Sequence, residues 1–166
     1  MKNVIQKLAA SGLLALAAGA ASAGDVTVNY IQPDRFSDLP FSAWDREEAL
    51  KELTEHFASL GAKLPPDQNM RIDVTDVDLA GREIPHRGVR DLRVIRNGAE
   101  WPRIDLRYTI ERNGQVLRTG EAQLRDMAFM DRISRYSDGD SLRFERRMID
   151  DWFNQEIMPR ERSARR

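Results

Sequence analysis

The chain has 166 residues, no cysteine and a formal net charge of −1, with 26 Lys and Arg against 27 Asp and Glu. The absence of cysteine excludes a disulfide framework and a thiol-linked lipid anchor. The balanced charge argues against the basic face that nucleic-acid-binding proteins present, so we expect no nucleic-acid partner.

The N-terminus has the pattern of a secretory signal peptide. Lys2 and Lys7 supply the positive segment, residues 8–20 are apolar, and residues 21–23 (Ala-Ser-Ala) form a small-residue cleavage site. We therefore expect cleavage after Ala23 and a soluble periplasmic protein; an uncleaved membrane helix is the alternative. Because no later segment approaches the roughly 20 apolar residues of a span, no transmembrane span is expected after cleavage.

Residues 24–159 are expected to form a single α+β domain, followed by a disordered Arg-rich tail at 160–166. Residues 26–30 alternate apolar and polar side chains, which is typical of a half-buried strand. A helix is expected from the N-cap Ser42 to about Leu60, with the apolar stripe Ala49, Leu50, Leu53, Phe57 and Leu60.

The next expected strand, residues 71–81, changes its apolar period part-way along. Ile72 and Val74 share one face, whereas Val77 and Leu79 share the other. One regular strand cannot place both pairs in one core, so we expect either a bulge near residues 75–76 or burial on both faces. Residues 81–88 are expected to form a loop.

Three strands of a meander are then expected at 89–96, 103–112 and 115–125, with the hairpin signal Asn113-Gly114 between the last two. A last helix begins near Asp140 or Ser141 and is stopped by Pro159. The fold class is therefore α+β, with a four- to five-stranded, mostly antiparallel sheet and two helices packed on one face. The expected apolar stripe of the last helix is Leu142, Met148, Ile149, Trp152, Phe153 and Ile157.

Several ordered motifs resemble those of a family of exported Gram-negative proteins that is defined only as a domain of unknown function. They are residues 76–81 (Asp-Val-Asp-Leu-Ala-Gly), 101–104 (Trp-Pro-Arg-Ile), 126–127, 144–148 and 152–153. The resemblance covers nearly the whole chain after residue 23 and implies a single periplasmic domain. The element order is also loosely similar to periplasmic accessory domains of envelope transport systems, a likeness at the level of the fold.

The carboxylates Asp73, Asp76 and Asp78 invite comparison with a calcium loop. Their spacing of three and then two residues, with Gly81 three residues later, does not fit the EF-type pattern. Two interpretations of Asp76 and Asp78 remain: hydrogen bonds to loop amides and Arg side chains at a strand end, or a cation or ligand site.

Glu145 lies inside the apolar stripe of the last helix, where a carboxylate must pair or become neutral. We expect this helix to pack near the acidic strand, so that Arg146 or Arg147 pairs with Asp76 or Asp78. These five residues form the candidate functional or ion-pair cluster. The aromatic residues at 101 and 152–153 are expected in the core rather than in a ligand wall.

No catalytic, metal-binding or cofactor-binding motif stands out, and His56 and His86 lack the spacing of zinc ligands. We therefore expect no cofactor and a non-catalytic binding or accessory module, whose partner is an envelope protein or a small ligand. The alternative is an acid–base hydrolytic enzyme, with or without a metal, that uses Asp76, Asp78 and Glu145. A pocket on which these three acids converge would favour the enzyme.

Overall fold

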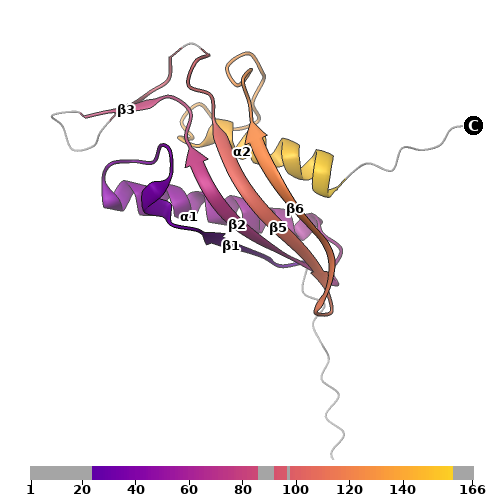
Figure 1. Cartoon of the computed structure of the whole chain (residues 1–166). Coiled ribbons are helices and arrows are strands. Elements are labelled where there is room, and N and C mark those ends of the chain that lie inside the picture. The colour runs from indigo at the N-terminus through magenta and orange to yellow at the C-terminus, as the bar shows by residue number, and fades with distance from the viewer. Residues whose placement is uncertain (1–23, 86–91, 97, 159–166) are drawn as a thin grey trace, which may run out of the picture.

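The computed structural model describes residues 24–85, 92–96 and 98–158, so the expected signal peptide and C-terminal tail lie outside the described residues. The chain has an α+β fold, as expected, with a four-stranded sheet in the order β1-β2-β5-β6 (Figure 1). Its strands are β1 (Val26–Tyr30), β2 (Gln68–Asp78), β5 (Arg103–Arg112) and β6 (Gln115–Arg125).

Both long helices cover the same face of this sheet (Figure 1). The first, α1 (Ala43–Leu60), begins at Ser42, whose side chain accepts a hydrogen bond from the amide of Asp45 at 3.4 Å, as the expected cap requires. Because α1 connects β1 to β2, these two strands lie parallel, whereas the other pairs of the sheet are antiparallel. The expectation of a mostly antiparallel sheet with two helices on one face is confirmed.

The second helix, α2 (Arg143–Trp152), continues into a π-helical turn (Phe153–Ile157) and so ends close to the expected Pro159. Its predicted apolar stripe is buried, and Trp152 makes edge-to-face contacts with Phe57 of α1 and Tyr108 of β5. Trp152 therefore belongs to the core shared by the sheet and both helices. Within the described ranges, no helix is both long enough and apolar enough to cross a membrane.

The change of period in β2 is resolved by a bulge. Its pairing with β5 shifts register between Val74 and Asp76, which leaves Thr75 as the extra residue. The bulge returns Val77 to the buried face that Ile72 and Val74 already occupy. Since side chains alternate along a strand, Asp76 and Asp78 then point away from the helices.

The hairpin between β5 and β6 is confirmed at its expected boundaries. Asn113 and Gly114 both have positive φ, 51° and 79°, as a two-residue turn with matching strand twist requires. Gly120 has a role that the sequence did not reveal, because a Cβ at this position would lie 2.6 Å from the Tyr108 ring. The small residue makes room for an aromatic ring of the neighbouring strand.

The expected three-stranded meander is wrong in its first strand, and the expected loop at 81–88 contains a strand. The chain forms a separate two-stranded sheet from β3 (Arg82–Ile84) and β4 (Leu92–Val94), which projects beside the main sheet (Figure 1). Residues 89–91 of the expected strand lie outside the described residues. The physical reason is that β5 already pairs with β2 and β6 along both edges, so β4 has no free edge of β5 to join.

Candidate functional site: a pocket at the end of β2

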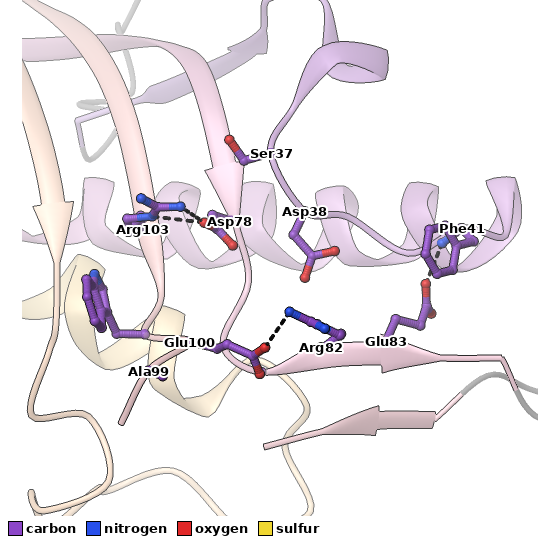
Figure 2. Close-up of a pocket in the computed structure, with 11 residues that line it drawn as sticks. Ser37, Asp38, Phe41, Asp78, Arg82, Glu83, Ala99, Glu100 and Arg103 are labelled. Atoms are coloured by element: carbon purple, nitrogen blue, oxygen red, sulfur yellow. Dashed lines mark hydrogen bonds and ion pairs between the residues drawn. The ribbon is translucent and has the colours of Figure 1, made fainter. Parts of the chain in front are cut away.

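A pocket of about 570 Å³ lies where β2 ends and β3 begins. Residues of three segments line it: 37–41, 78–83 and 99–103 (Figure 2). We call it the β2-end pocket. Of the five residues in the sequence-predicted cluster, Asp78 lines the pocket, while Asp76 and Glu145 each hold one of its walls in place.

Asp76 fixes the first wall. Its carboxylate accepts hydrogen bonds from the amide and the hydroxyl of Ser37, at 2.7 and 2.6 Å. The next residue, Asp38, joins the end of β2 like a short added strand: its amide donates to Val77 O at 3.0 Å and its carbonyl accepts from the Leu79 amide at 3.2 Å. The segment that begins at Ser37 is therefore tied to β2 by both side chain and backbone.

Asp78 pairs across the sheet with Arg103 of β5 (Figure 2). The Nε of Arg103 donates to its Oδ2 at 2.9 Å, and the Nη2 of Arg103 donates to the same oxygen. This hydrogen bond and the charge of Asp78 raise the pKa of the guanidinium, which is already far above neutrality. The pair is a fixed ionic element of the pocket wall.

Glu145 holds the end of β2 from the helix side. Its side chain is only 1 % exposed, and Oε1 accepts a hydrogen bond from the Ala80 amide at 2.7 Å. Burial raises the pKa of this carboxyl above its usual value of 4.5, and the hydrogen bond from Ala80 opposes part of that shift. Glu145 is buried, as its place in the apolar stripe predicts. Its Oε1 has a backbone amide as partner, whereas its Oε2 has no hydrogen-bond partner among the described residues.

Gly81 turns the chain from β2 into β3. Its φ of +80° favours glycine, and an added Cβ would lie 2.6 Å from Val94 O of β4. Its amide donates to Glu100 O at 2.9 Å, which brings the 99–103 segment against the pocket. Residues 76–81 therefore form the end of β2 and the turn into β3, and they set the shape of this side of the pocket.

The expected pairing of Arg146 or Arg147 with the acids of β2 is not observed. Arg146 pairs with Glu52 of α1 at 3.0 Å and with Asp140 at 3.3 Å. Arg147 pairs with the buried Asp126 at 2.9 Å. The cause is the bulge, which turns the acids of β2 to the face of the sheet that the helices do not cover.

Arg147 also organises the loop after β6. Its guanidinium donates to Phe129 O at 2.6 Å and to Arg132 O at 2.7 Å, in addition to Asp126. Such a planar donor set suits the capture of several acceptors by one side chain. Arg147 is therefore part of the structural framework.

A second buried polar cluster joins the two helices, around Asp150. Its Oδ1 lies 3.3 Å from Nε2 of His56, and its Oδ2 accepts from Arg135 and Tyr136. Burial by itself would raise the pKa of Asp150, but the hydrogen bonds from these three side chains outweigh it and lower the pKa. His56 is buried and links α1 to α2.

Sequence reasoning missed most of the side chains that line the pocket, including Asp38 and Glu83. Asp38 accepts a hydrogen bond from Arg93 of β4 at 2.8 Å. Glu83 of β3 is buried, and its Oε2 accepts from the Phe41 amide at 2.5 Å (Figure 2). Their stretches of sequence were expected to be loops or a strand of the main sheet, and no local pattern indicated that they meet.

The acids proposed for catalysis do not converge on one cavity. Asp78 lines the β2-end pocket, Asp76 is bound to Ser37, and Glu145 is buried on the helix side. No group of three or more His, Asp or Glu side chains suited to a metal ion occurs among residues 24–85, 92–96 and 98–158. The three acids are thus placed to fix the positions of the segments around the β2-end pocket.

Comparison with known proteins gives one match. The family model described as "Protein of unknown function (DUF3016)" matches residues 24–155, which is most of the chain. No curated protein and no solved structure matches. On the extent of this match, the chain belongs to the DUF3016 family.

Proposed function

We propose that this protein is an exported, non-catalytic binding module of the periplasm, and that the β2-end pocket receives its partner. The observation that carries the proposal is that two acids of β2 and one of α2 hold the walls of one pocket around the end of β2. Asp76 positions Ser37, Asp78 holds Arg103, and Glu145 holds Ala80. A pocket with walls fixed in this way is pre-organised, which reduces the ordering cost of binding.

The same contacts argue against acid–base hydrolysis. A general acid and base must both lie within hydrogen-bond reach of the reacting atoms. Of the three acids in question, Asp78 alone lines the pocket, and it is engaged by Arg103. Glu145 has the raised pKa of a general acid, but its burial against Ala80 separates it from any substrate in the pocket.

Export is supported by the sequence of residues 1–23, which has the charged, apolar and small-residue segments of a signal peptide in the required order. The test is fractionation of cells that express the full-length gene, followed by N-terminal sequencing of the product. A periplasmic protein that begins at Gly24 is the expected result. A cytoplasmic product with its N-terminus intact would refute this part of the proposal.

The binding role is tested by placing a photo-crosslinking amino acid at position 82, on the rim of the pocket, in the full-length protein. The matched control carries the same group at Arg107, an exposed position on the face of the sheet that the helices leave uncovered. We expect irradiation of living cells to yield a crosslinked species of defined mass from position 82, at least tenfold above position 107. Equal yields, or no product from position 82, would contradict a binding role for this pocket.

A further inference from the structure

Strand β3 has one paired edge and one edge that faces the β2-end pocket. It pairs with β4 on one side, in the register Arg82 with Val94, Glu83 with Arg93 and Ile84 with Leu92. The pocket is lined by Gly81, Arg82 and Glu83, and by none of the described residues of β4. Because successive side chains of a strand point to opposite faces, a cavity that meets three consecutive residues meets the strand along its edge.

Figure 2 shows the same arrangement. The strand paired with β3 lies on the side of β3 away from Asp38 and Phe41, and the pocket residues gather on the other side. An isolated two-stranded hairpin is at best marginally stable in water, and strands of three residues are short. This small sheet is therefore one strand short of an arrangement with independent stability.

Among the described residues, no strand pairs with this second edge of β3, which we call the free edge, and it is nevertheless held in position. Glu83 is anchored to the Phe41 amide, and Gly81 is anchored to Glu100 O. On the β4 side, Arg93 reaches from its strand to Asp38 at 2.8 Å. Because the amide and the carbonyl of Gly81 are already engaged, the edge can offer backbone donors and acceptors to an incoming strand at residues 82–84, and it needs no prior ordering there.

The charges around this edge indicate which side chains a bound segment would carry. The pocket lining contains four carboxylates (Asp38, Asp78, Glu83 and Glu100) and two guanidinium groups (Arg82 and Arg103). Both arginines are more exposed than the acids they pair with, so their head groups lie toward the rim. Arg93 pairs with Asp38 from outside the lining, so among the described residues Glu83 is the lining carboxylate without an arginine partner, and a basic side chain that enters the pocket can pair with it.

The opposite face of β3 and β4 carries exposed apolar side chains next to Arg82. Ile84 and Leu92 are directly paired across the two strands, and both are exposed. Since Glu83 and Ile84 are neighbours on one strand, they face opposite sides. An added strand would thus meet carboxylates with one set of its side chains and apolar surface with the alternate set.

We propose that the β2-end pocket binds an extended peptide segment of a partner protein, which adds to the free edge of β3 as a third strand and carries alternating basic and apolar side chains. This inference rests on the proposed binding function and specifies its partner. The backbone of the segment supplies the hydrogen bonds, and its basic side chains provide the selectivity against acidic segments.

The test uses the purified protein, expressed from its full-length gene, and the fluorescent peptide Val-Lys-Val-Lys-Val with blocked ends. Two matched probes are the peptide with Glu in place of Lys and the Lys peptide with alternate backbone amides methylated. Anisotropy titrations are expected to show at least tenfold tighter binding of the unmodified Lys peptide than of either matched probe. Hydrogen exchange of the amides of β3 should slow by at least tenfold when that peptide is bound.

Variants place the binding in the pocket. Glu83→Gln keeps an oxygen for the Phe41 amide but removes the charge, and we expect it to weaken Lys-peptide binding at least fivefold. Asp38→Asn is a second variant of the same kind. The control Glu121→Gln, on an exposed carboxylate of β6, should leave the affinity unchanged, and thermal unfolding of each variant reports on its fold.

Four outcomes would overturn the inference. Equal affinity for the methylated peptide would exclude strand addition, and equal affinity for the Glu peptide would exclude the charge selection. Failure of all three peptides to bind at millimolar concentration, while position 82 still crosslinks to a partner in cells, would leave the proposed function standing and reject this partner class. A crosslink from position 82 to a second copy of this chain would identify the occupant as the protein itself.

Discussion

Arginine–carboxylate pairs occur both around α2 and around the β2-end pocket, and they differ in burial. The side chains of Arg147 and Asp126 are 7 % and 6 % exposed, whereas those of Arg82 and Glu100 are 76 % and 28 % exposed. The first pair is enclosed by the helix and the loop after β6. The second lies at the rim of a pocket, where water competes for both partners.

This difference in burial indicates that arginine–carboxylate pairs have two roles in the molecule, one structural and one at a binding surface. Breaking a buried pair leaves an uncompensated charge in a low-dielectric surrounding, so the pair fixes the structure around it. An exposed pair contributes little stability and can exchange partners at low cost, which suits a binding surface. Burial therefore decides which pairs are part of the framework and which are available to a ligand.

The largest effect is expected for Arg147→Met. The substitution leaves the buried Asp126 without its closest cation and removes two hydrogen bonds to loop carbonyls. We expect the free energy of unfolding to fall by roughly 3–5 kcal/mol, measured by urea denaturation at pH 7. A loss below about 1 kcal/mol would show that the buried pair does not fix the structure.

Asp150→Asn should have the next largest effect, a loss of roughly 2–3 kcal/mol at neutral pH, because three side chains donate toward this carboxylate. The folded-state pKa of Asp150 is lowered from 3.8: burial opposes the shift and the bonds from His56, Tyr136 and Arg135 outweigh it. The stability from this group is therefore present above pH 4 and is lost as the pH falls toward the lowered pKa. Urea titrations from pH 7 to pH 2.5 should show a shallower acid loss for Asp150→Asn than for the wild type.

The ionisation of Glu145 makes the free energy of unfolding depend on pH in the opposite direction. Its folded-state pKa is raised from 4.5 by burial, so the folded protein holds this proton more tightly than the unfolded chain. Ionisation therefore removes stability as the pH rises from 4.5 to the raised pKa. Glu145→Gln keeps an acceptor for the Ala80 amide, and its stability relative to the wild type should increase over that range in urea titrations.

The matched variant Glu145→Ala removes the acceptor and leaves the Ala80 amide buried without a partner. We expect it to lose roughly 1–3 kcal/mol at pH 7 by the same urea measurement. If Glu145→Ala and Glu145→Gln had equal stability at that pH, the hydrogen bond to Ala80 could not be what holds the end of β2.

The smallest effect on stability is expected for Arg82→Met, because its pair with Glu100 is largely exposed. The free energy of unfolding should change by less than about 1 kcal/mol. The contrast with Arg147→Met is the sharpest test of the comparison, since both substitutions remove one arginine of an ion pair. Similar losses in the two variants would show that burial does not separate the two groups of pairs.

Local patterns in the sequence predicted the elements that local forces build. The alternation at 103–112 and 115–125 and the Asn113-Gly114 turn gave β5 and β6 at their observed ends. The Ser42 cap and the apolar stripe gave α1 in the same way. The change of period in β2 predicted either a bulge or burial on both faces, because one strand can present only alternate residues to a core, and the structure has the bulge.

The pairing of charges could not be predicted in this way. The chain has 26 Lys and Arg and 27 Asp and Glu, so most arginines have several acids to choose from. Which acid meets Arg147 depends on where the helix lies and on which face of the sheet the bulge turns Asp76 and Asp78 toward. These are properties of packing between distant segments.

By itself, the sequence determined the four strands of the main sheet, the two long helices and the burial of Glu145, because each follows from spacing within one short stretch. The tertiary structure alone decided that β1 lies parallel to β2, that β3 and β4 form a sheet of their own, and that Asp38 and Glu83 border one pocket. Each of these joins segments far apart along the chain. Contacts of that kind are selected by the packing of the whole fold, which no local period records.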